Sequence, residues 1–149
     1  VQCALDGAKS ITIFNPRDGF FEKAEKMVEK IQEKVPACQV ELYDLDAKDV
    51  MREKIDAADI LVNGTLLGMK PREDTSVIND PSLFHEGLVV ADVVYNPKET
   101  RLLREAKEHG CTVVPGNGML LWQGVAAFKL FTGKDMPVEE VKEKFFSEA

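Results

Sequence analysis

The sequence predicts an α/β fold: a Rossmann-like parallel sheet with helices on both faces. Three observations lead to this prediction. Strand-like segments alternate with helical ones along the chain, several strands are apolar on both faces, and Gly, Asn or Pro follows most of them. Strands buried on both faces are typical of parallel sheets, because their crossover helices cover both sides. The 149 residues fit a single domain, 1–149.

The first half of the chain predicts three helices and two strands. The clearest element is a helix over 20–35, in which apolar residues recur every three or four positions among lysines and glutamates, and which ends before Pro36. The other elements expected here are a helix ending at Gly7, a strand over 10–15, a strand over 38–45 and a short helix from about Ala47.

The second half predicts three buried strands and three helices. The strands are short apolar runs that stop at Asn63-Gly64, at Pro97 or at Pro115-Gly116, and proline cannot donate to a strand ladder. In chain order the expected elements are strands over 59–65, 88–97 and 111–116, and helices from about Glu99 to Gly110, from about Met119 to Phe131 and from Pro137 onward.

Composition excludes several classes of function. The net charge is −7, with 26 acidic and 19 basic residues interleaved, so the clustered basic residues of a nucleic-acid site are absent. No run of 18 apolar residues predicts a membrane span, residues 1–15 do not form a signal peptide, and we expect a cytoplasmic protein. Cys3, Cys38 and Cys111 lie far apart and predict neither a disulfide framework nor a metal site; we expect Cys38 and Cys111 to be buried.

The candidate site is the set of segments that follow the strands, because ligands of parallel α/β sheets bind beyond the carboxyl ends of the strands. After the first strand comes Asn15-Pro16-Arg17-Asp18. Asp18 could hold the hydroxyls of an adenosine ribose, which favours NAD; it would repel a 2′-phosphate, an effect that Arg17 could partly offset. Asp18 could equally be an N-cap of the following helix. Both interpretations remain open on the residue alone.

The position of this acid raises a second point. In dinucleotide-binding folds such an acid lies about 20 residues after a glycine-rich phosphate loop. Only ten residues precede the strand here, and none forms such a loop. Either the acid is a coincidence or the chain starts inside such a fold, and the residues alone leave both open.

Three colinear segments carry a resemblance to a known family. "NGTLLGMKP", "ADVVYNPKETRLLREAKEHGC" and "GNGMLLWQGVAAFKLFTGKDMP" occur in the order and near the spacing of the shikimate dehydrogenases, and "FNPRD" followed by two phenylalanines matches their quinate/shikimate type. The chain resembles the C-terminal NAD(P)-binding domain of that family over nearly its whole length. The resemblance implies a fragment without the N-terminal substrate domain, in which the Rossmann-like sheet lacks its first strand and the glycine-rich loop.

The resemblance also implies roles for individual residues. Tyr95 and Gln123 would contact the substrate, shikimate or quinate. Gln123 interrupts an apolar helix, where a polar amide needs a partner, whether backbone, water or ligand. We expect Trp122 and Phe128 to belong to the core. The cofactor, NAD by preference or NADP, would contact Asn15, Pro16, Arg17, Asp18, Thr65, Leu66, Val93, Asn96 and Gly116, whose bare backbone would let the nicotinamide approach.

The resemblance places proton transfer on a lysine and an aspartate outside this chain, so we assign no catalytic residue here and expect His85 and His109 to be structural. The implied reaction is reversible NAD(P)-dependent reduction of 3-dehydroshikimate, with 3-dehydroquinate as a further candidate. The fragment alone should be inactive and bind nucleotide weakly, and a homodimer is left open. Two alternatives are a stand-alone nucleotide-binding or regulatory module without catalysis, and an NADPH-dependent dehydrogenase of another small ring acid.

Overall fold

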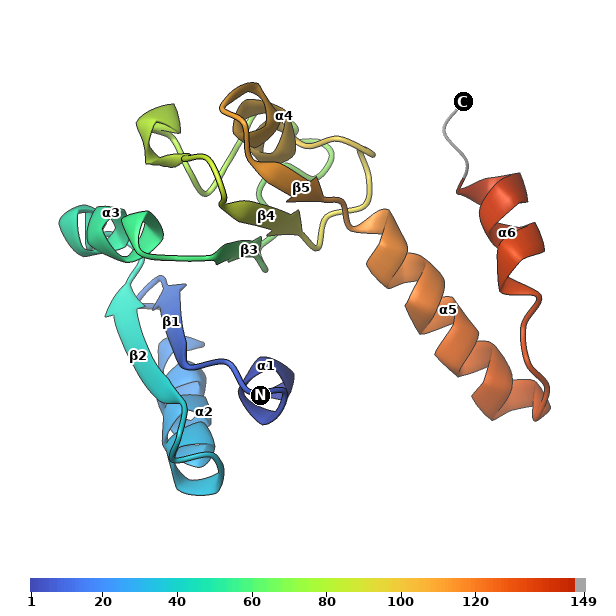
Figure 1. Ribbon diagram of the computed structural model, residues 1–149, viewed down its shortest axis with the longest axis horizontal. Coiled ribbons are helices and arrows are strands. Elements are labelled where there is room, and N and C mark those ends of the chain that lie inside the picture. The colour runs from blue at the N-terminus through green and yellow to red at the C-terminus, as the bar shows by residue number, and fades with distance from the viewer. Residues whose placement is uncertain (147–149) are drawn as a thin grey trace. The chain divides into compact units, whose positions relative to one another are not determined.

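The computed structural model describes residues 1–146 and contains the predicted alternation of helices and strands (Figure 1). The chain divides into two compact units, Val1–Ala57 and Ala58–Ala149. The first holds α1 (Gln2–Leu5), β1 (Ser10–Asn15), α2 (Phe21–Lys34), β2 (Gln39–Asp44) and α3 (Lys48–Asp56); the second holds β3 (Ile60–Asn63), the 3-10 turn η1 (Pro81–Leu83), β4 (Val89–Asp92), α4 (Arg101–Glu108), β5 (Thr112–Val114), α5 (Asn117–Thr132) and α6 (Val138–Phe145).

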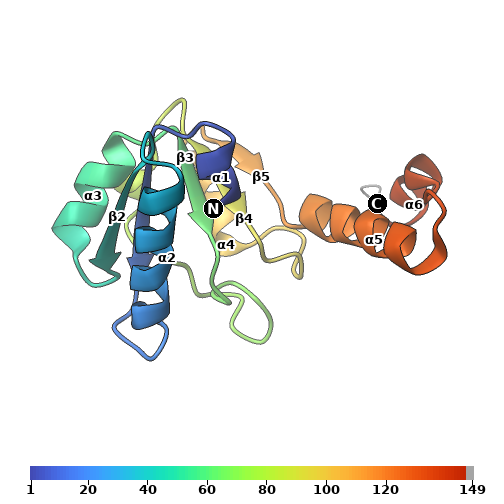
Figure 2. The ribbon, with the colours of Figure 1, turned by 90° about the horizontal axis from the view of Figure 1, so that it is seen from below.

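The first unit is a parallel strand pair with a helix against it. β1 and β2 pair in register from Ser10 opposite Gln39 to Asn15 opposite Asp44, and α2 runs alongside both strands (Figure 2). Phe21 and Ile31 are the buried residues of α2, whereas the predicted apolar positions Phe20 and Met27 are exposed. The core of the first unit contains Ala4, Ile31, Cys38 and Val40.

The second unit is built on a three-stranded parallel sheet in the order β3-β4-β5. Thr100 begins α4: its hydroxyl accepts a hydrogen bond from the Leu103 backbone N–H at 3.4 Å, as expected of a threonine N-cap. α4 then buries its apolar face against β4 and β5. The fully buried side chains of this core include Leu88, Val90, Leu102 and Leu103.

The strand pairing confirms the predicted α/β fold class, in which parallel strands are flanked by helices. The usual order of a dinucleotide-binding sheet is 3-2-1-4-5-6. If the five described strands take the second to sixth places of that order, it predicts a β2-β1 pair and a β3-β4-β5 trio. These are the two sheets that the described residues form.

Three expectations about burial are wrong. β3 and β5 are not buried on both faces: Ile60 and Val62 are each 60% exposed, and Val114 is also exposed. In the described chain β3 pairs only with β4 and is an edge strand. Trp122 is 63% exposed rather than part of the core, while Phe128 is half-buried. Among the described residues, no helix is both long and apolar enough to cross a membrane.

Candidate functional site

Polar residues end four of the five strands at the edge where ligands of parallel sheets bind. Asn15 and Asp44 are the last residues of β1 and β2 and lie opposite each other. Asn63 and Asp92 hold the same relation in β3 and β4. Each unit thus presents an Asn–Asp pair at its carboxyl edge, and the residues predicted to bind cofactor follow directly after them.

In the first unit, Asp18 closes the turn that leads into α2. Its Oδ1 accepts a hydrogen bond from the Phe20 backbone N–H at 2.8 Å, and its carbonyl accepts one from Phe21 at 3.0 Å. Phe20, not Asp18, is the N-cap residue itself. The N-cap interpretation of Asp18 is therefore wrong, and its bond to the Phe20 N–H closes the turn before the helix. That bond uses one carboxylate oxygen of an exposed side chain, so a ribose contact by the other oxygen is compatible with it.

Arg17 is held by its neighbours in the first unit. Its Nε donates to Asp44 Oδ2 at 2.9 Å, and its guanidinium lies 4.7 Å from the centre of the Phe21 ring. Asn15 Nδ2 donates to the Pro16 carbonyl at 2.9 Å, which folds the chain back at the end of β1. The segment between β1 and α2 is thus organised by its own side chains.

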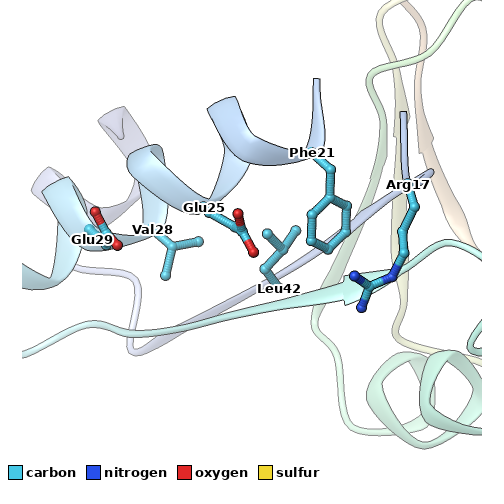
Figure 3. A pocket seen from close by; sticks show the side chains of 6 residues that line it. All are labelled: Arg17, Phe21, Glu25, Val28, Glu29 and Leu42. Atoms are coloured by element: carbon cyan, nitrogen blue, oxygen red, sulfur yellow. The ribbon is translucent and has the colours of Figure 1, made fainter. Parts of the chain in front are cut away.

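A hollow of about 460 Å³ opens along α2 and β2 (Figure 3). Glu25 and Glu29 on its α2 side would repel a phosphate, and Arg17 is the single predicted site residue on its wall. The hollow therefore does not mark the predicted cofactor site. Its lining is Arg17, Phe21, Glu25, Val28, Glu29 and Leu42.

In the second unit, a buried hydrogen-bond network joins the ends of β3 and β4 to the start of α4. Asn63 Nδ2 donates to Asp92 Oδ1 at 3.0 Å, and Thr100 Oγ1 donates to Asp92 Oδ2 at 2.6 Å. All three residues are buried. Sequence reasoning missed Asp92 and Thr100 as site residues and treated Asn63 only as a strand end. Two features of the sequence could have indicated them: Asn63 and Asp92 each end an apolar strand, and Thr100 precedes a helix with an apolar face.

Thr65, a predicted cofactor contact, bonds to Asn63 of this network, and its hydroxyl is engaged. Thr65 Oγ1 donates to Asn63 Oδ1 at 2.8 Å and accepts from the Leu67 backbone N–H at 3.1 Å. These bonds shape the loop after β3. Leu66, in the same loop, is exposed.

Val93 and Gly116 come together next to the same network. The backbone at Gly116 packs so closely against the turn after β4 that a Cβ there would lie 2.6 Å from the Val94 carbonyl oxygen and 2.7 Å from that of Val93. This contact alone requires glycine, independently of any cofactor. Tyr95 and Asn96 continue the turn and are exposed.

Gln123 lies on α5 and is exposed, so water can serve as the partner of its amide. Only Leu121 of this apolar helix is buried. The two histidines bond to backbone carbonyls: His109 Nδ1 lies 2.8 Å from the Glu105 oxygen and His85 Nδ1 lies 3.0 Å from that of Glu86. No group of His, Cys, Asp and Glu among the described residues could hold a metal ion.

Comparison with known proteins agrees with this arrangement. Residues 116–144 match the family model of the shikimate 5'-dehydrogenase C-terminal domain. A quinate/shikimate dehydrogenase of Escherichia coli O139:H28 is 48% identical over 142 residues, which are 95% of this chain and 49% of the relative. The chain is similar to the C-terminal part of the shikimate dehydrogenase family. The predicted resemblance is confirmed, and the chain spans about half the length of the curated relatives it matches.

Solved structures of the shikimate dehydrogenase family share the fold. The shikimate 5-dehydrogenase of Listeria monocytogenes, in complex with shikimate and NAD, matches with a TM-score of 0.88 and 45% identity, over 95% of this chain and 49% of that one. The quinate dehydrogenase of Corynebacterium glutamicum, in complex with NAD, matches with a TM-score of 0.77 and 32% identity, over 97% and 48%. Other shikimate dehydrogenases among the matched structures hold NADP. The family thus binds NAD or NADP.

Proposed function

We propose that this chain is the NAD(P)-binding domain of a shikimate or quinate/shikimate 5-dehydrogenase. The intact enzyme would catalyse the reversible reduction of 3-dehydroshikimate, with 3-dehydroquinate as a further candidate substrate. The proposal rests on the polar residues that end four of the described strands and on the family-like segments that follow them. The chain is also 48% identical to a quinate/shikimate dehydrogenase over 142 residues.

NAD is the preferred cofactor in this proposal. Asp18 uses one oxygen on the Phe20 N–H, and the other would accept from the ribose hydroxyls. A 2′-phosphate in the same place would meet this negative charge. Arg17 is the nearest cation in sequence, but Asp44 already binds it. The charge balance around Asp18 therefore favours the cofactor without the extra phosphate.

The second unit would contact the nicotinamide and the substrate. Val93, Asn96 and Gly116 would line the nicotinamide, with Thr65 and Leu66 beside the cofactor. Tyr95 and Gln123 are both exposed, which leaves their polar groups accessible to a substrate hydroxyl. When bound, the nicotinamide supplies the hydride acceptor of the reaction. None of the described residues is assigned the accompanying proton transfer.

The test is a steady-state assay with the product of the complete reading frame that encodes these residues. Shikimate and quinate are each supplied with NAD⁺ and with NADP⁺, and nucleotide reduction is followed by absorbance. We expect turnover in the NAD⁺ pair to exceed that in the NADP⁺ pair. Folded protein that is silent in all four combinations would overturn the proposal and favour a binding module without catalysis.

A further inference from the structure

The buried carboxylate of Asp92 has no part in the function proposed so far. Its side chain is 4% exposed and accepts three hydrogen bonds: two at Oδ1, from Asn63 Nδ2 and the Val94 backbone N–H, and one at Oδ2, from the Thr100 hydroxyl. All three donors are neutral groups. A carboxylate kept out of water in this way is costly unless its acceptors are satisfied. These bonds satisfy it while fixing the positions of the donors.

The donors come from three different segments around one turn. Asn63 ends β3, Thr100 begins α4, and Val94 lies in the turn after β4. The Val93 N–H is also bound, to the Asn63 carbonyl at 3.1 Å. Both backbone donors at the start of this turn are therefore held by the network of Asn63, Asp92 and Thr100.

The backbone at Gly116 restrains the same turn by packing against the carbonyl groups of Val93 and Val94. The 2.6 Å and 2.7 Å distances from a would-be Gly116 Cβ to the Val94 and Val93 oxygens leave no room for these peptides to move toward α5. Amides bound by Asn63 and Asp92, and carbonyls packed on Gly116, leave the turn little freedom. Rigid support of this kind is what a precise binding site needs.

We propose that Asp92 is a positioning residue: through Val94, Asn63 and Thr100 it holds the turn 93–95 in the geometry that orients the nicotinamide and Tyr95 for hydride transfer. This inference rests on the proposed function and deepens it. A carboxylate suits the task because it accepts all three bonds without donating any. An asparagine of the same shape would turn an NH₂ group toward one of the three donors.

The test compares Asp92→Asn with the wild type in the full-length product. We expect kcat for shikimate oxidation to fall about tenfold or more, since small misplacements of reacting groups are costly. The inhibition constant of ADP-ribose, which lacks the nicotinamide, should stay within about twofold of wild type. Ser76→Ala is the matched control: it removes a buried hydroxyl that accepts from the Ile78 N–H, outside this network, and should not change kcat.

Each outcome decides the matter. A kcat of Asp92→Asn equal to wild type overturns the inference alone, and an equal loss of ADP-ribose affinity also overturns it, because the residue then supports the fold in general. A wild type without turnover overturns the proposed function together with the inference. If Asp92→Asn does not fold, Thr100→Val should lower kcat and Thr100→Ser, which keeps the hydroxyl donor, should restore it; equal kcat for these two variants overturns the inference.

Discussion

The guanidinium of Arg17 is bound to the carboxylate of Asp44, with 2.9 Å between Nε and Oδ2. The two residues follow and end neighbouring parallel strands, and Arg17 also stacks on the Phe21 ring. This contact pairs the cation nearest to Asp18 in sequence with a different carboxylate. The relation between Arg17 and Asp44 therefore bears on which nicotinamide cofactor the protein prefers.

Asp44→Asn should shift the cofactor preference toward NADP⁺. The substitution keeps Oδ1, which accepts from the Asp46 N–H at 2.9 Å, but removes the charge that holds Arg17. Exposed ion pairs are weak, so we expect the ratio of kcat/KM for NADP⁺ to that for NAD⁺ to rise by at most about fivefold. Asp46→Asn, the removal of a neighbouring carboxylate, is the control. A ratio that stays the same or falls would contradict this account.

Gly116→Ala should destabilise the chain by about 1–3 kcal/mol, the usual effect of forcing an extra methyl into a packed site. The cause is steric, because the added Cβ would meet the Val93 and Val94 carbonyls and the backbone φ of −68° is itself ordinary. Urea unfolding followed by circular dichroism measures the loss. Gly118→Ala, in the same helix with nothing within 4 Å, should instead gain about 0.5–1 kcal/mol. Equal effects at both positions would refute the steric explanation.

Cys111 should react with thiol reagents much more slowly than Cys3. It is 8% exposed, and burial raises the pKa of its thiol, so less thiolate is present at a given pH. Cys3 is exposed. Iodoacetamide labelling near pH 8, read by mass spectrometry, should show a rate difference on the order of tenfold or more. Similar rates in the folded protein would count against this prediction, and equal labelling in urea is the control.

Acid should weaken the first unit partly through Glu41. Lys54 Nζ donates to its Oε2 at 2.6 Å and Tyr43 donates to its Oε1 at 3.0 Å, and these bonds lower the pKa of Glu41 below 4.5. The folded state then binds fewer protons, so this contribution is present above pH 4.5 and is lost as the pH falls through the lowered pKa. Glu41→Gln should be less stable than wild type at neutral pH, and the gap should close in acid.

Urea unfolding of the wild type and Glu41→Gln across this pH range measures that gap. Glu25→Gln, which removes a carboxylate of α2 outside these bonds, is the control and should show a smaller pH dependence relative to wild type. A gap that widens as the pH falls would mean that Glu41 is not stabilised as a carboxylate.

The order of elements could be predicted because local pattern determines it. Alternating residues predicted β1 over the residues it occupies, and the three-and-four spacing predicted α2 to within a residue or two. The parallel arrangement followed from apolar strands joined by helices. The segments after the strands could be named for the same reason, since a sheet of this kind places them at one edge.

Side-chain partners could not be predicted, because they depend on residues distant in sequence. Asp92 meets Asn63 across 29 positions, and Arg17 meets Asp44 across 27. No local pattern reports such pairs. The prediction of burial failed for a related reason. An apolar helix such as α5 predicts that other segments cover its side chains. In the described residues, however, Leu130 and Phe131 are among the most exposed apolar side chains.

The central claim, that the segment after β1 holds the adenosine ribose, is tested most directly by Asp18→Asn. This variant keeps an oxygen for the Phe20 N–H and removes the charge and the second acceptor. In the full-length product we expect kcat/KM for NAD⁺ to fall about tenfold or more, and that for NADP⁺ to fall less. If both values stay at wild type, Asp18 only caps the turn before α2 and the claim is wrong.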